Sequence, residues 1–144
     1  MSLYRLIYAS DTADYVDWTD LKDILLKSQE NNERLDVTGI LVMASGKFLQ
    51  VLEGSRNHLN ALYRKILQDS RHKDSRLVSY TPIHERHFSE WSMRGINAGM
   101  MKPELKALLI KKYGAAPDGS LTVPEDPFLS HSFLYDIYPK ILKF

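Results

Sequence analysis

The order in which hydrophobic periodicity changes along the chain restricts its fold more than any other feature. Strand-like and helix-like patterns follow one another as strand, helix, strand, strand, helix, strand, with a fifth short strand expected at about 91–96. The six main elements are expected at residues 3–9, 18–31, 37–43, 47–52, 57–68 and 76–84. The order βαββαβ is that of the ferredoxin-like fold. We therefore predict an α+β domain with two helices on one face of the sheet, and Pro82 places the fourth strand at an edge or a bulge.

The other face of the predicted sheet needs a cover of its own, because alternation puts Leu3 and Ile7 on it. Two C-terminal helices can supply this cover. The first, over about residues 103–113, opens on a proline, and a linker rich in Pro, Gly and Asp leads to the second, from about residue 128. Pro139 should end or kink the second helix. A C-terminal helical extension over the second sheet face completes the predicted fold.

Composition excludes several classes of protein. The chain has 144 residues, of which 44% are hydrophobic and 26% charged, which suits one globular domain. A net charge of +1 argues against a nucleic-acid surface, and no apolar run reaches membrane-spanning length. The N-terminus lacks the pattern of a secretion signal, so a cytoplasmic location is expected. The absence of cysteine excludes disulfides, thiolate nucleophiles and cysteine-ligated metals.

Gln50 is the most unusual residue of the predicted core. It lies in the run Lys47-Phe48-Leu49-Gln50-Val51-Leu52, which otherwise reads as a buried strand. A primary amide carries two donors and an acceptor, and burying them unmatched costs a few kcal/mol. Gln50 must therefore meet another polar group inside the fold. That partner is either a neighbouring protein group or the polar edge of a ligand.

The C-terminal end of the first helix offers further polar groups. Its inward positions change from leucine and isoleucine to Ser28, Asn31 and Asn32. Asparagine is common at helix ends simply as a cap, and a ligand-facing role is the alternative. Tyr8 at the end of the first strand and Gln50 in the third should be neighbours in the sheet, so these five side chains can converge on one cleft. Apolar walls are expected from Ile24, Phe48 and Ile66.

Such a cleft suits a flat, neutral heterocycle with imide edges. The chain has no glycine-rich phosphate cradle, so a phosphate on the ligand would lie near the rim, beside Lys65, Arg71 and His72. His72, His84 and His87 do not predict a metal site, because neither cysteine nor a carboxylate-rich pocket accompanies them.

Several segments, in this order, resemble the BLUF family, the sensors of blue light using FAD. They are Leu3–Ser10, Asn31–Asn32, Val37–Leu41, Phe48–Gly54, Arg71–His72 and Trp91–Met93. Each motif is short, but all of them in order are specific. The match runs from the first strand to about Met93, and the length and order resemble the short, stand-alone BLUF proteins.

The resemblance implies a flavin held noncovalently between the two helices. Asn31 and Asn32 match the positions that hydrogen-bond the carbonyl and imide edge of its ring. Arg71 and His72 match a cofactor-contacting pair, and Lys65 stands where relatives often carry arginine. FAD is expected, with FMN as the alternative, because the ring contacts are common to both. The flavin-binding domain would span residues 1–97, and residues 98–144 would form a helical cap rather than an independent domain.

The resemblance also implies a photochemical role for four residues. Tyr8 would give an electron and a proton to the excited flavin, and Gln50 would then rotate or tautomerise and shift the absorption to the red. A phenol near its ordinary pKa of about 10 is protonated in the dark, as this role requires. Trp91 and Met93 match positions that adjoin the glutamine, although burial tendency alone would make both of them core residues.

The function that follows is a blue-light photoreceptor rather than an enzyme, with output through the C-terminal region to a separate effector protein. A homo-oligomer is expected. The alternatives are a ferredoxin-like enzyme or a small-ligand binding module without photochemistry. An acylphosphatase-like enzyme needs a phosphate-binding loop with arginine, whereas the loop at residues 10–14 is acidic. An RNA-binding module needs exposed sheet aromatics and a basic surface, and neither is evident.

Overall fold

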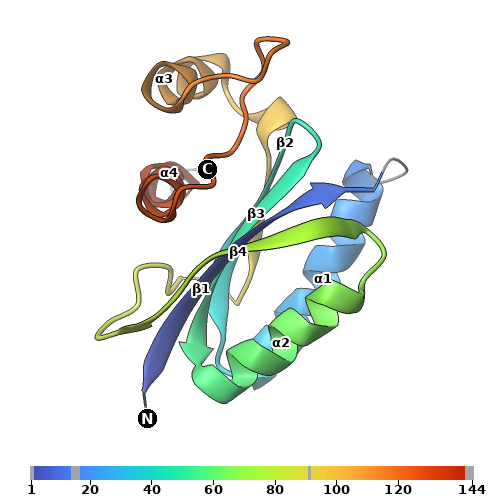
Figure 1. Ribbon diagram of the computed structural model, residues 1–144, viewed down its shortest axis with the longest axis vertical. Helices are drawn as coiled ribbons and strands as arrows, with labels where there is room; N and C mark the ends of the chain where they lie inside the picture. Colours follow the sequence, from blue (N-terminus) through green and yellow to red (C-terminus); the bar gives the residue numbers. More distant parts are fainter. Residues whose placement is uncertain (1, 14–16, 91, 142–144) are drawn as a thin grey trace.

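The computed structural model describes residues 2–13, 17–90 and 92–141 of the chain. Five strands form one sheet in the order β4-β1-β3-β2-β5 (Figure 1). Neighbouring strands are antiparallel except for β2 and β5, which are parallel. The strands are β1 (Leu3–Thr12), β2 (Thr38–Ala44), β3 (Lys47–Ser55), β4 (His72–Ile83) and β5 (Arg94–Asn97). The sheet confirms the predicted ferredoxin-like order with a fifth strand, and β4, which contains Pro82, lies at an edge.

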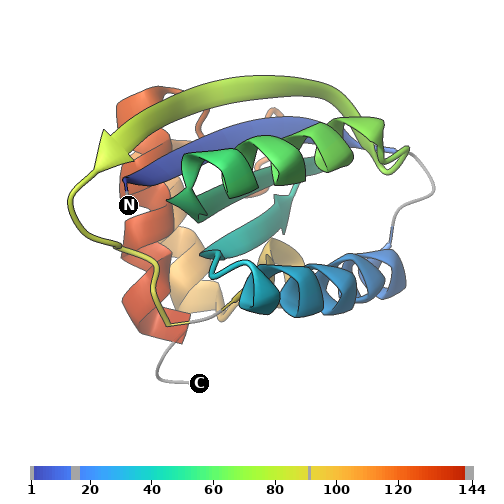
Figure 2. The same ribbon diagram turned by 90° about the horizontal axis from the view of Figure 1, so that it is seen from below.

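Helices cover both faces of the sheet, as predicted. Helices α1 (Trp18–Arg34) and α2 (Arg56–Gln68) lie on one face, and α3 (Pro103–Tyr113) and α4 (Pro127–Ile141) lie on the other (Figures 1 and 2). A short 3-10 helix, η1 (Ala98–Met100), follows β5. No helix of the described ranges is both long and apolar enough to cross a membrane.

Alternation along the central strands divides the core into two layers. Leu6, Leu41 and Leu52 pack with Leu21 of α1 and Leu59 of α2. Their neighbours in sequence point to the opposite face and meet the C-terminal helices. The buried members of that second layer include Ile7, Ile40, Val42, Val51, Leu109, Phe133 and Ile137. The C-terminal helices are therefore part of the core of the fold.

Local signals in the sequence set the ends of these elements. Asp17 caps α1, where its carboxylate accepts from the amide of Asp20 in a capping box, and Ser55 caps α2. The turn between β2 and β3 places Ser45 and Gly46 at φ of 51° and 73°. Two successive positive φ angles are what a tight two-residue hairpin requires. This turn fixes the register of β2 and β3, in which Leu41 lies opposite Gln50.

Several predicted boundaries were wrong. Strand β1 runs on to Thr12, so Tyr8 lies within the strand and not at its end. The extension pairs with residues at the start of β4, which therefore begins at His72 and not at residue 76. Irregularities in register at Ile7/Tyr8 and Ala9/Asp11 let this pairing continue although the alternation has lapsed.

Helix α1 also continues further than predicted, to Arg34. Asn31 and Asn32 are therefore helical residues of the last turn, and Leu35 takes the cap position. Pro139 was predicted to end or kink helix α4, and the helix does not end there but runs on to Ile141. Proline removes one backbone donor, and the loss of one hydrogen bond in a last turn does not stop a helix that is already formed.

Strand β5 is shorter than predicted, because it begins at Arg94. The carbonyls of Ser92 and Met93 instead accept hydrogen bonds from side chains of α1. Trp91, which was expected in this strand, lies outside the described residues.

Candidate functional site

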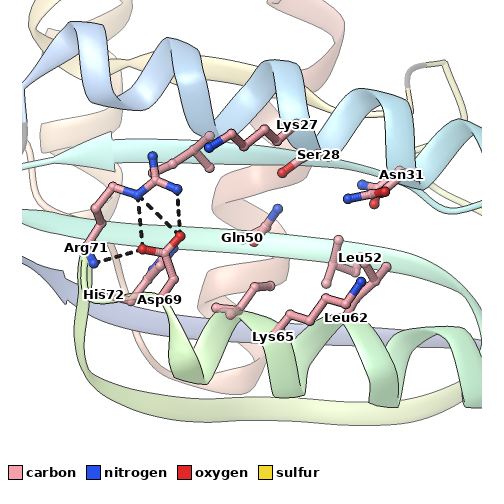
Figure 3. Close-up of a pocket in the computed structure, with 13 residues that line it drawn as sticks. Lys27, Ser28, Asn31, Gln50, Leu52, Leu62, Lys65, Asp69, Arg71 and His72 are labelled. Carbon is pink, nitrogen blue, oxygen red and sulfur yellow. Dashed lines mark hydrogen bonds and ion pairs between the residues drawn. The ribbon is translucent and has the colours of Figure 1, made fainter.

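A cleft of about 230 Å³ lies between α1 and α2, with β3 as its floor (Figure 3). Its lining comes from four parts of the chain: α1, β3, α2 and the connection from α2 into β4. The lining residues are Ile24, Lys27, Ser28, Asn31, Asn32, Gln50, Leu52, Leu62, Lys65, Ile66, Asp69, Arg71 and His72. The polar groups of α1 therefore face the glutamine of β3 across an otherwise largely apolar space.

Gln50 is held at both ends of its amide. Tyr8 lies directly opposite Gln50 in the β1–β3 pairing, and its hydroxyl donates a hydrogen bond to Gln50 Oε1. Gln50 Nε2 points to Met93 Sδ at 3.3 Å. All three side chains are buried. A thioether is a weak acceptor, so the amide is held firmly by the phenol and only lightly by the sulfur.

The environment of Tyr8 changes the expected pKa of its phenol. Burial raises the pKa of Tyr8 well above the ordinary value of 10.0, and the nearby Tyr63 and Asp69 raise it further. The prediction of a pKa near 10 is therefore corrected upward. Since the anion would have to form in a fully buried place, Tyr8 remains protonated and is a donor to Gln50.

The polar residues of α1 differ in how far the protein already satisfies them. Asn32 is buried, and its Nδ2 donates to the carbonyl of Ser92 at 2.9 Å. Asn31 Oδ1 accepts from Arg34 at 3.2 Å, which leaves its amide nitrogen available. Within the described ranges the hydroxyl of Ser28 has no protein hydrogen-bond partner. Donors and acceptors thus remain along this wall for a bound molecule.

A group of charged residues closes one end of the cleft. The guanidinium of Arg71 binds Asp69, with an Nη2–Oδ2 distance of 2.7 Å (Figure 3). It also reaches Asp23 of α1 at 2.9 Å. The Arg71 hydrogen bonds lower the pKa of Asp69, and the carboxylates raise the pKa of Arg71 in turn. Arg71 therefore connects α1 to the start of β4, and its charge is already balanced.

His72 lies beside this ion pair but is neutral. Its Nδ1 is 2.9 Å from the hydroxyl of Ser10, and its ring packs on Phe48 at 4.7 Å between centroids. Burial lowers the pKa of His72 from 6.5 to about 4, and Asp69 offsets only part of this effect. The imidazole is therefore uncharged at neutral pH.

Most of the residues expected in the cleft line it, and two do not. Ile24, Ser28, Asn31, Asn32, Gln50, Lys65, Ile66, Arg71 and His72 do so. Tyr8 and Phe48 are fully buried and contact the cleft only through Gln50 and His72. Met93 reaches it through Gln50. The described residues hold no group of three metal-ligating side chains.

Four lining residues were not foreseen: Lys27, Leu52, Leu62 and Asp69. Helical spacing could have indicated two of them, because Lys27 is one turn before Asn31 and Leu62 one turn before Ile66. Leu52 points to the same face of β3 as Gln50, because it follows Gln50 by two residues along the strand. Asp69 carries no such signal, since its position depends on the ion pair with Arg71.

The comparisons with known proteins agree with this geometry. The family model described as "BLUF: Sensors of blue-light using FAD" matches residues 3–94. The chain is 35% identical over 101 residues to "Photoactivated adenylate cyclase subunit beta" of Euglena longa. That match covers 69% of this chain but only 12% of the relative's length.

Solved structures have the same fold. The structure "BlrB - a BLUF protein, dark state structure" superposes with a TM-score of 0.75 at 31% identity, over 94% of this chain and 97% of that chain. "Structure of a bacterial light-regulated adenylyl cylcase" gives a TM-score of 0.70 at 31% identity, over 76% of this chain and 33% of that chain. On the family match, which spans strands β1 to β4 and both cleft helices, this chain belongs to the BLUF family.

Proposed function

We propose that this chain is a blue-light receptor that binds a flavin noncovalently in the cleft between α1 and α2. The observation that carries the proposal is the buried series Tyr8–Gln50–Met93 at the floor of the cleft. In this series a phenol, which can give up an electron and a proton, is hydrogen-bonded to an amide. The two ends of that amide are a donor and an acceptor of similar size. Membership of a family described as sensors of blue light using FAD supports the same reading.

The residues that line the cleft fit such a ring. Ser28, Asn31 and Asn32 can meet carbonyl and imide edges, while apolar side chains cover the faces. Those apolar residues are Ile24, Leu52, Leu62 and Ile66. A volume of about 230 Å³ is close to the lower end of small-molecule sites, about 300–1,000 Å³, so a ring system would enter while a polar tail stays at the mouth.

The protein's own groups account for a switch without a covalent bond. A bound flavin supplies the absorption of blue light and an excited acceptor for one electron. Tyr8 would give that electron, and its phenolic proton would pass to Gln50 Oε1 along the existing hydrogen bond while the Gln50 amide passes a proton on to the flavin. Return of the electron and the proton to Tyr8 would close the cycle. Because burial holds the phenol protonated, the two particles leave together. Gln50 would then exchange its donor and acceptor ends, which gives up the bond from Tyr8 to Oε1 as well as the weak contact of Nε2 with Met93 Sδ.

Absorption spectroscopy tests this function. The purified protein, supplied with flavin, should be yellow and should show a small, reversible red shift after blue illumination. Gln50→Leu should keep the flavin but lose the shift, and Tyr8→Phe should lose the photocycle. Failure to bind flavin, or a normal shift in Gln50→Leu, would contradict the proposal.

We assign FAD as the cofactor, with its phosphates at the mouth near Lys27 and Lys65. Lys65 has no ion-pair partner among the described residues, whereas Arg71 is already held by two carboxylates. Lys65→Ala should therefore weaken FAD binding more than riboflavin binding. Chromatography of the chromophore released by acid distinguishes FAD from FMN, and a preference for FMN would overturn the assignment.

We further propose that residues 1–97 are the sensor and that residues 98–144 carry the signal to a separate effector protein. Support comes from the packing of α3 and α4 on the sheet face opposite the cleft. The names of relatives, photoactivated adenylate cyclases, associate such domains with an effector. Light should change hydrogen exchange in α4, and identical exchange in dark and light would contradict this route. Light scattering tests the homo-oligomer that we also propose.

A further inference from the structure

Besides the residues that line the cleft, helix α1 has side chains that contact the segment before β5. Asn32 Nδ2 donates to the carbonyl of Ser92 at 2.9 Å, and Gln29 Nε2 donates to the carbonyl of Met93 at 3.0 Å. Both donors are side-chain amides, and both acceptors are backbone groups that the β2–β5 pairing, which starts at Arg94, leaves free. The side-chain amides of α1 therefore donate the hydrogen bonds to these carbonyls that a neighbouring strand would donate in a sheet.

Close packing adds a third point of attachment. A Cβ built at Gly95 would lie 2.1 Å from Leu25 Cδ1, so helix and segment are in direct contact there. Leu25, Gln29 and Asn32 follow each other at helical spacing and meet Gly95, Met93 and Ser92 in that order. Asn32 also lines the cleft, and Leu25 makes only an apolar contact. Gln29 donates a hydrogen bond to the segment without lining the cleft.

We propose that Gln29 is a positioning residue that holds the Met93 backbone so that the thioether lies against Gln50. This inference rests on the proposed photoreceptor function for its consequence but not for its geometry. Met93 Sδ is 3.3 Å from Gln50 Nε2, and the Met93 carbonyl is held by Gln29. On the side away from the cleft, Gln50 can turn only in the space that Met93 leaves, because that side is closely packed. Gln29 therefore sets the barrier to reversal of the amide after illumination.

Methionine oxidation tests the positioning without any flavin. Met93 is 1% exposed and Met100 is 69% exposed, so peroxide should oxidise Met100 quickly and Met93 slowly in the wild type. In Gln29→Leu, which keeps the size but removes the donor, Met93 oxidation relative to Met100 should rise about fivefold, the factor for one ordinary hydrogen bond. Gln29→Lys restores a donor and should protect Met93 again.

A neighbouring surface variant supplies the matched control. Glu30 is exposed on the same helix turn, and Glu30→Gln should leave Met93 protected. An unchanged oxidation ratio in Gln29→Leu would overturn the proposal. So would equal deprotection in Gln29→Leu and Glu30→Gln, since the effect would then come from the helix and not from this donor.

Recovery kinetics test the consequence in the flavin-loaded protein. Dark recovery of Gln29→Leu should be about fivefold faster than that of the wild type, and Gln29→Lys should return towards it. Faster oxidation with unchanged recovery would overturn the role of Gln29 in the photocycle. A wild type without any red shift would instead contradict the proposed function, and the oxidation experiment would still decide the positioning.

Discussion

Removing one partner of the Tyr8–Gln50 hydrogen bond should cost more stability than removing both. The phenol of Tyr8 is fully buried and donates to Gln50 Oε1. Gln50→Leu leaves that hydroxyl in a dry place without an acceptor, which costs about 1–3 kcal/mol. Tyr8→Phe leaves an amide oxygen of Gln50, which lines the cleft, without its donor, so its cost should be about 1 kcal/mol. With both changes no polar group is orphaned, and most of the penalty should vanish.

Urea unfolding of the flavin-free proteins at pH 7, followed by circular dichroism, gives the free energies of this double-mutant cycle. The double variant should be more stable than the two single losses predict, by about 1–2 kcal/mol. Tyr113, whose hydroxyl bonds Ser132 and Asp136 in the C-terminal layer, provides the control. Tyr113→Phe combined with Gln50→Leu should be additive, because the two sites share no partner.

Additive losses for Tyr8→Phe and Gln50→Leu, within about 0.5 kcal/mol, would refute the reasoning. They would mean that the phenol does not donate to this amide in solution. Gln50 Oε1 would then point elsewhere, and the dark orientation on which the proposed switch depends would be wrong. The experiment thus tests the starting state of the switch without light or cofactor.

Three further perturbations test other parts of the structure. His72 has a pKa of about 4 in the folded protein and 6.5 in the unfolded chain, so the unfolded chain binds a proton at higher pH. The free energy of unfolding should therefore fall by up to about 3 kcal/mol as the pH drops from 6.5 to 4. Urea midpoints across that range should fall less in His72→Phe. Gly95→Ala should cost about 1–3 kcal/mol, because the added methyl would clash with Leu25. In thermal melts the same change should cost less in a Leu25→Ala background than in the wild type. Arg5→Met should cost about 3–5 kcal/mol because the buried carboxylate of Glu53 loses its ion partner, and adding Glu53→Gln should recover part of that in the same melts.

Pattern alone was sufficient for the arrangement of the core. The βαββαβ order implies that β1 and β3 are central neighbours, and that topology places Tyr8 beside Gln50. The amide in an apolar strand was a reliable signal, because a buried polar group must have a partner. Its partners proved to be the protein groups Tyr8 and Met93, while the same side chain also faces the cleft. The two explanations weighed from the sequence are therefore compatible.

Features that depend on contacts far apart in the sequence could not be predicted. Asp69 lines the cleft because Arg71 holds it, and Arg71 in turn reaches Asp23 on another helix. The strand expected from residue 91 starts at Arg94, because side chains of α1 take the preceding carbonyls. The hydrophobic periodicity of a sequence does not indicate a hydrogen bond from a helix side chain to a backbone group far away in the chain. Such bonds decide where a strand begins even though each one is worth only about 1 kcal/mol.

The loop between β4 and β5 connects the cleft with the C-terminal helices. At one end Met93 contacts the amide of Gln50. Earlier in the loop, the amides of His87 and Phe88 donate to the buried carboxylate of Glu53, which lies on the same strand as Gln50.

The side chains of this part of the loop then reach α4. His87 Nδ1 lies 3.1 Å from His131 Nε2, and the His87 ring stacks on Tyr135. We expect a shift of Met93 to be passed along this loop to its contacts with β3 and α4. Because Glu53 holds the loop to the sheet by two backbone bonds, loosening that carboxylate should separate the light response of α4 from that of the cleft. Glu53→Gln should keep the red shift of the flavin and lose the light-dependent change in hydrogen exchange of α4. Retention of both would show that the signal does not pass through this loop, whereas loss of both would show that Glu53 is needed for the flavin response itself.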